Sequence, residues 1–122
     1  MTQEDKKLLL IDLCARLPYY TELYSNVADG NWAILTPVVI SNLMSATDKL
    51  VIKPYLRPMS SMTDEEYKEY SKLWDLQNEF PTDIDIRFKT DVFDWLNAHH
   101  FDYRGLIPMG LALEAPNEIY NN

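Results

Sequence analysis

The segment from Thr90 to Pro116, TDVFDWLNAHHFDYRGLIPMGLALEAP, constrains the fold of this chain more than any other. It contains both histidines and two of the three glycines, and it ends in a short apolar run. Val92, Trp95 and Leu96 are spaced i, i+3 and i+4, which predicts a helix with one apolar face. Because histidines are tolerated in the last turn of a helix, we expect this helix over residues 91–100.

The residues that follow this helix predict a tightly packed extended region. Asp102 lies between Phe101 and Tyr103, so its carboxyl group is the one whose pKa an apolar environment is most expected to shift. Arg104, two residues later, is the expected ion-pair partner of Asp102. The apolar run 111–113 is bounded by glycine and proline, which favours a buried strand.

An N-terminal helix is expected over residues 3–16. Thr2 and Asp5 have the spacing of a capping box, and leucines recur every four residues along one side. Cys14 falls beside these leucines. We therefore expect it to be a small buried apolar side chain rather than a nucleophile.

The centre of the chain predicts a small antiparallel sheet of three or four strands. Asp29-Gly30 favours a hairpin turn between two aromatic, β-prone stretches. A polar loop is expected over residues 41–48 and a proline-containing linker over 53–58. The expected strands cover residues 19–24, 32–36, 38–40 and 49–53.

A second helix is expected over residues 64–77, because Thr63 and Glu66 form a capping box before a strongly periodic stretch. Its aromatic residues Tyr67, Tyr70 and Trp74 share one face. They form either part of the core or an exposed ridge that binds a partner.

Residues 84–88, which follow this helix, alternate apolar and charged side chains, which predicts a short edge strand or a pinned loop. The fold class is therefore α+β, with one domain over residues 1–122. It consists of an N-terminal helix, the small sheet, and two further helices packed on it.

The net charge of −8 is concentrated in the second half of the chain. Residues 63–122 carry thirteen acidic side chains against five basic ones, whereas residues 1–62 are balanced at six of each. Such a surface repels phosphate backbones, so direct nucleic-acid binding is disfavoured. The acidic half is interpreted as a solubilising face, with an acidic mimic of DNA as an alternative.

Composition places the chain among globular proteins rather than membrane proteins. No stretch approaches the roughly 20 apolar residues of a membrane span, and no secretory signal pattern occurs at the N-terminus. A single cysteine cannot form an internal disulfide. We therefore expect a cytoplasmic protein without membrane association.

The chemistry-bearing residues form no strong constellation. His99, His100 and Asp102 are the only candidates for a metal site, and they are weak because adjacent helical histidines point about 100° apart. Their alternative role is to be held structurally at a helix end. We therefore predict no catalytic residue, no metal and no cofactor.

Two segments, KPYLRPMSSMTDEEYKEY (Lys53–Tyr70) and DWLNAHHFDYRGLIPMGLALEAP (Asp94–Pro116), resemble a pair that recurs in uncharacterised proteins of gut Bacteroidales bacteria and their phages. Together they cover 41 of the 122 residues. The resemblance implies a cytoplasmic protein of bacterial, phage or mobile-element origin. It implies no activity, ligand or catalytic residue.

The function predicted from the sequence is that of a non-enzymatic interaction or accessory protein with a protein partner. The leading hypothesis places the contact at Tyr67, Tyr70 and Trp74 or at other exposed rings. An enzyme that uses His99, His100 and Asp102 with a metal or by acid–base chemistry is the alternative from another class. The oligomeric state is left open.

Overall fold

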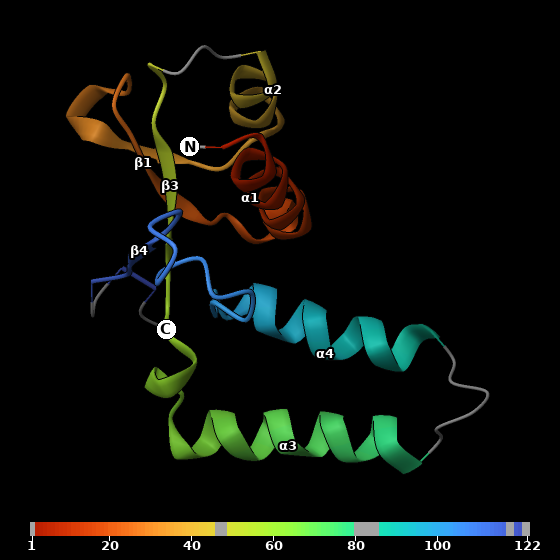
Figure 1. Ribbon diagram of the computed structural model, residues 1–122. Coiled ribbons are helices and arrows are strands. Elements are labelled where there is room, and N and C mark those ends of the chain that lie inside the picture. The colour runs from red at the N-terminus through yellow and green to blue at the C-terminus, as the bar shows by residue number, and fades with distance from the viewer. Residues whose placement is uncertain (1, 46–48, 80–85, 117–118, 121–122) are drawn as a thin grey trace.

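A computed structural model describes residues 2–45, 49–79, 86–116 and 119–120 of the chain, with backbone only for 76–79 and 86–91. It confirms the α+β class. Helices α1 and α2 lie together beside the sheet, and α3 and α4 run antiparallel at the opposite end of the molecule (Figure 1). The helices are α1 (Gln3–Arg16), α2 (Pro37–Ser45), α3 (Asp64–Glu79) and α4 (Ile86–Ala98).

The described part of the chain forms a four-stranded mixed sheet in the order β2-β1-β3-β4. Strand β1 pairs antiparallel with both β2 and β3, as predicted, but β4 pairs with β3 in parallel. The chain returns to β4 only after α3 and α4, and such a long crossover permits parallel pairing. The strands are β1 (Glu22–Ser25), β2 (Trp32–Ile34), β3 (Ile52–Leu56) and β4 (Leu113–Glu114).

The stretch 53–58, predicted to be a linker with two prolines that is extended or contains a short turn, is extended through Leu56, but it belongs to strand β3 of the sheet rather than to a linker. Proline is tolerated inside β3 because the Pro54 nitrogen does not face β1. Tyr24 pairs with Lys53, and the Asn26 N–H donates to the Val51 carbonyl at 3.1 Å, so the odd-numbered residues of β3 bond to β1. Pro54 therefore faces the other neighbour, and parallel pairing with β4 begins only at Tyr55.

Helix α2 replaces the predicted strand at 38–40 and most of the predicted loop at 41–48. Pro37 occupies the first helical position, where its fixed φ favours helix and no backbone donor is needed. The Thr36 hydroxyl accepts a hydrogen bond from the Val39 N–H at 3.4 Å, which caps the helix. Ile40 and Leu43 are buried one turn apart, so the apolar run has the period of a helix.

Two further predictions are wrong. Helix α4 begins at Ile86, within the stretch predicted as an edge strand or loop, whereas residue 84 lies outside the described residues. Cys14 is exposed rather than buried. The buried face of α1 consists of Leu9, Asp12, Leu13 and Arg16. Cys14 does not lie on this face of the helix.

The capping boxes that predicted α1 and α3 are both present. Thr2 and Asp5 exchange side-chain and backbone hydrogen bonds, and so do Thr63 and Glu66. Two apolar cores follow from the arrangement of elements. One lies between the sheet, α1 and α2, and the other lies between α3, α4 and the segment after α4.

Leu13→Ala is predicted to reduce the free energy of unfolding by about 3 kcal/mol, because Leu13 is fully buried in the larger core. Ile11→Ala on the same helix is the matched control. Its side chain is 48% exposed, so we expect less than about 1 kcal/mol. Urea unfolding of both variants measures the difference, and equal losses would contradict the assigned face of α1.

Candidate functional site

Helix α4 ends in a Schellman motif with a histidine at the position that glycine usually occupies. The His100 N–H donates to the Asn97 carbonyl and the Phe101 N–H to the Leu96 carbonyl, each at 3.0 Å. His100 has a φ of 63°, in the left-handed region that is unfavourable for most side chains. Phe101 and Leu96 both belong to the smaller core, which supplies the apolar contact typical of the motif. The helix therefore ends as predicted, near His100.

The imidazole of His100 is enclosed by residues from distant parts of the chain. Its Nδ1 lies 3.3 Å from the Thr21 hydroxyl, and its ring stacks on that of Tyr120 with centroids 3.7 Å apart. Burial, followed by the positive charges of Arg16, His99 and Arg57, lowers the pKa of His100 to about 4. The ring is therefore held neutral at physiological pH.

The Tyr120 hydroxyl also bridges two strands of the sheet. It accepts a hydrogen bond from the Glu22 N–H at 2.8 Å and donates to the Tyr55 carbonyl at 2.7 Å. Glu22 and Tyr55 would otherwise be the next bonded pair of the β1–β3 ladder. Burial raises the pKa of the Tyr120 hydroxyl, so it remains a neutral donor and acceptor.

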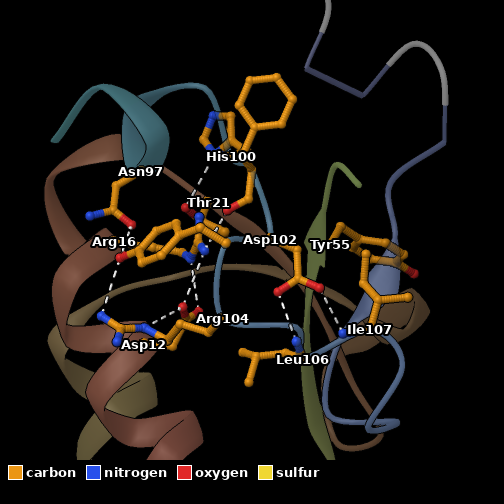
Figure 2. Close-up of polar contacts among 12 residues, drawn as sticks. Asp12, Arg16, Thr21, Tyr55, Asn97, His100, Asp102, Arg104, Leu106 and Ile107 are labelled. Carbon is orange, nitrogen blue, oxygen red and sulfur yellow. Dashed lines mark hydrogen bonds and ion pairs between the residues drawn. The ribbon is translucent and has the colours of Figure 1, made fainter. Parts of the chain in front are cut away.

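Asp102 is fully engaged by backbone donors, as Figure 2 shows. Its two carboxylate oxygens accept hydrogen bonds from the Leu106 N–H at 2.8 Å and the Ile107 N–H at 2.9 Å. The predicted ion pair with Arg104 is wrong, because Arg104 turns toward α1 and bonds to Asp12 at 3.1 Å. Asp102 thus organises the turn that follows it.

A buried ionic cluster, defined here as Asp12, Arg16 and Arg104, joins α1 to the segment after α4 (Figure 2). Asp12 and Arg16 are both fully buried and form a bidentate pair at 2.8 and 3.1 Å. Arg16 also donates to the Phe101 carbonyl at 2.7 Å. Both guanidinium groups lie over the ring of Tyr103, at 5.3 Å for Arg16 and 4.9 Å for Arg104.

One donor in this cluster is incompletely satisfied. The Nη1 atom of Arg16 is buried without a hydrogen-bond partner among the described residues. The guanidinium group as a whole lies over the Tyr103 ring, whose hydroxyl in turn donates to Asn97 at 2.9 Å. The cluster is closed to solvent at Asp12 and Arg16, and only Arg104 reaches the surface.

The three weak metal candidates do not converge. The His99 ring stacks on Trp95, and its Nδ1 lies 2.8 Å from the Trp95 carbonyl, whereas His100 faces Thr21 and Asp102 faces backbone N–H groups. Across the described ranges, no group of three or more His, Cys, Asp or Glu side chains is placed to hold a metal ion. The geometry therefore gives the metal hypothesis no support.

The predicted partner-binding residues of α3 are separated by the fold. Tyr67 is 62% exposed, but Tyr70 and Trp74 are partly buried against the smaller core. Tyr70 contacts the rings of both Trp74 and Trp95, which belong to α3 and α4. This aromatic face mainly joins the two helices, and Tyr67 alone of the three remains freely accessible.

A different exposed apolar surface, called here the β2–α2 surface, was not predicted from the sequence. It consists of Val27, Trp32, Ile34 and Val38, with exposed fractions of 73, 39, 49 and 65%; Trp32 and Ile34 project from one face of β2, and Val27 lies at the other. A groove of about 320 Å³ lies beside it. The groove is lined by residues of β1, β2, α2 and the segment before β3, which are mostly apolar: Leu23, Ser25, Val27, Ala28, Ala33, Val39, Asn42, Leu50 and Ile52.

A larger hollow of about 450 Å³ lies between the first turn of α1 and the start of β3. Its polar rim includes Thr2 and Asp5, which already bond to each other in the capping box, and Lys6, which donates to the Met44 carbonyl at 3.5 Å. These contacts engage three of the five polar side chains that line the hollow, the other two being Gln3 and Lys53. The hollow is therefore a weaker binding candidate than the β2–α2 surface.

The sequence contained a signal for each of the missed features. Asp12 and Arg16 fall on the same helical face as Leu9 and Leu13, which places an i,i+4 ion pair among core positions. The β2–α2 surface lies in a stretch, residues 17–48, that has no lysine or arginine at all. Apolar residues without nearby basic side chains are unusual for a solvated face.

Asp12→Ala is predicted to lower the free energy of unfolding by about 3 kcal/mol or more, because it leaves the buried Arg16 cation without its counter-ion. Arg104→Ala removes a cation that is 28% exposed, so we expect a loss of only about 1 kcal/mol. Chemical denaturation at neutral pH compares the two. A smaller loss for Asp12→Ala than for Arg104→Ala would show that the cluster is assigned incorrectly.

The pH dependence of stability is predicted to contain a contribution from His100. Its folded pKa of about 4 lies below the ordinary 6.5, so the unfolded chain binds the proton first as the pH falls. This contribution is complete above pH 6.5 and is lost toward pH 4, by roughly 3 kcal/mol at about 1.4 kcal/mol per pKa unit. The hydrogen bond from Arg57 lowers the pKa of Glu66 to about 2, so the contribution of Glu66 to the pH dependence of stability falls mainly below this pH range.

His100→Asn provides the control for this prediction, because asparagine tolerates a positive φ better than most residues. Urea unfolding of the wild type and the variant between pH 4 and 7 measures the slope. We expect a shallower slope for the variant. Identical slopes would mean that His100 is not held neutral by its surroundings.

Comparisons with known proteins supply no identity for this site. No protein-family model, no curated protein and no solved structure matches the chain. Within the described ranges, none of the helices has both the length and the apolar character needed to cross a bilayer. The function is therefore argued from the geometry of the chain itself.

Proposed function

We propose that this chain is a non-enzymatic binding module that contacts a partner protein through the β2–α2 surface. The observation that carries the proposal is that exposed apolar side chains border the sheet edge at β2 on both of its faces, with Trp32 and Ile34 on one face and Val27 at an apolar groove on the other. Exposed apolar surface at such an edge is costly in water and is typical of protein-binding sites. A tryptophan within such a surface is a frequent anchor of binding energy.

The charged residues around this surface support a protein partner rather than a nucleic acid. Residues 17–48 contain no basic side chain, and their described acidic residues are Glu22 and Asp29. A nucleic acid would meet the carboxylates of Glu22 and Asp29 and no basic side chain within residues 17–48. A partner that presents apolar side chains with basic neighbours would find a complementary surface.

The polar cluster around His100 and Asp102 supports a structural role for these residues. Each carboxylate or imidazole described there already bonds to backbone, hydroxyl or guanidinium groups within the chain. General acid–base catalysis needs a titratable group within reach of a substrate. The deep burial of this cluster therefore favours a binding module over an enzyme.

The cytoplasmic location and the phage or mobile-element origin belong to the same proposal. Both rest on the resemblance of Lys53–Tyr70 and Asp94–Pro116 to proteins of gut Bacteroidales bacteria and their phages. The first of these segments includes β3 and the start of α3, and the second includes the end of α4 and β4. Neither contains the β2–α2 surface, so the resemblance is independent of the proposed contact.

Val38→Asp is predicted to abolish partner capture, because it replaces one of the exposed apolar side chains of the β2–α2 surface by a charge. Tyr67→Asp is the matched control, since Tyr67 is exposed to a similar extent but belongs to α3, which lies at the far end of the molecule from α2 (Figure 1). Affinity capture from native lysate with the wild type and both variants measures the effect. If the partner is lost with Tyr67→Asp and kept with Val38→Asp, the proposal is wrong and the interface lies on α3.

A further inference from the structure

We propose that strand β2 is a docking edge that pairs with an extended, basic-flanked segment of the partner protein. This inference rests on the proposed function and specifies how its surface binds. The occupant would add a fifth strand next to β2. Such strand addition obtains affinity from main-chain hydrogen bonds and specificity from pockets for alternate side chains.

The backbone of β2 presents unpaired hydrogen-bonding groups at the sheet edge. The Leu35 N–H donates to the Thr21 carbonyl at 2.8 Å, and Ala33 lies opposite Leu23 in register. Because bonded residues alternate in an antiparallel pair, Ala33 and Leu35 bond to β1 and Ile34 faces outward. In the described part of the chain, nothing bonds to the Ile34 N–H, the Ile34 carbonyl or the Trp32 carbonyl.

The two faces of β2 offer different contacts to an added strand. Ala33 faces the apolar groove, which also includes Val39 of α2. Trp32 and Ile34 lie on the opposite face, where the Trp32 ring stacks on Tyr55 at 4.5 Å. Alternate side chains of an incoming strand would therefore enter the groove or pack beside these rings.

Charge complementarity identifies the chemistry of the occupant. The edge is flanked by Asp29 and by Glu22, which holds the Trp32 Nε1 at 2.9 Å, and residues 17–48 contain no cation; Lys53, which is in register with Tyr24 and Trp32, lies on β3, two strands away from β2. Lysine or arginine on both sides of an apolar β segment would be attracted by these carboxylates. A second copy of this chain is disfavoured, because it would bring the same acids and a net charge of −8 to the edge.

The opposite edge of the sheet is less suited to this role. Strand β4 contains only Leu113 and Glu114, and Pro116, which has no N–H, follows closely. On its inner side, pairing with β3 cannot extend back past Pro54. Strand addition is therefore assigned to β2.

The test uses a nine-residue peptide with a central Val-Thr-Val-Thr-Val sequence and two lysines at each end. Titration of ¹⁵N-labelled protein to millimolar peptide measures affinity and amide shifts, and amide exchange reports protection at Ile34. We expect saturable shifts at Trp32 and Ile34 and slowed exchange of the Ile34 amide. A peptide that is N-methylated at alternate residues, or that carries glutamates in place of the lysines, should bind at least about tenfold more weakly.

Ile34→Pro provides the decisive variant, because it removes the outward N–H while leaving the bonds of Ala33 and Leu35 to β1. Ile34→Val, which keeps the donor, is the matched control. We expect the proline variant to bind at least about tenfold more weakly and the valine variant to bind like the wild type. Circular dichroism establishes that both remain folded, and if the proline variant does not, the N-methylated peptide decides.

Two results would overturn the inference: no binding of the lysine-flanked peptide to wild type, or equal binding of the N-methylated peptide. Either result, combined with loss of the captured partner by Val38→Asp, would leave the proposed function standing and reject only the strand-docking mode. Retention of the partner by Val38→Asp would reject the proposed function itself. Peptide shifts confined to α3 or to the larger hollow would also reject the assignment to β2.

Discussion

The buried guanidinium group of Arg16 is the interaction on which the arrangement of this chain depends. It lies at the end of the first helix and donates to the Phe101 carbonyl, 85 residues later in the sequence. A cation without access to solvent must be neutralised, and Asp12 one turn earlier does this. The stacking of Tyr103 below both arginines fixes the segment after α4 against α1. Helix α1 and the segment after α4 are thus held together by charge as well as by apolar packing.

The segment after α4, residues 99–116, connects the two apolar cores. Phe101 belongs to the core between α3 and α4, whereas Leu106, Leu111 and Ala112 belong to the core beneath the sheet. Asp102 lies between these two groups and shapes the turn that carries the chain from one core to the other. The histidines occupy this junction because they can be held there by stacking and hydrogen bonds.

The sequence predicted the elements whose ends carry local signals. The capping boxes at Thr2 and Thr63 located α1 and α3, and the Asp29-Gly30 turn located the β1–β2 hairpin. Helix α2 was missed because an apolar run after a proline suits a strand as well as a short helix. The parallel pairing of β4 depends on contacts between residues far apart in the sequence, which no local pattern contains.

The candidate site was less predictable than the fold. His100 was correctly placed at a helix end, but its partners Thr21 and Tyr120 lie in other parts of the sequence. Arg104 was assigned to the nearer carboxylate, although backbone donors had already satisfied Asp102. The exposure of Val27 and Val38 depends on where α2 lies, and that position was itself unknown from the sequence.

The position of Pro54 has a consequence for how this protein can assemble. Pro54 has no N–H to donate on the side of β3 that faces β4, so the parallel pairing begins only at Tyr55 and β4 is two residues long. Growth of a fibril needs two complementary edges on each molecule, whereas a molecule with a single usable edge forms a pair and stops. By keeping β4 short, Pro54 limits the number of backbone groups that this edge of the sheet offers to a further strand.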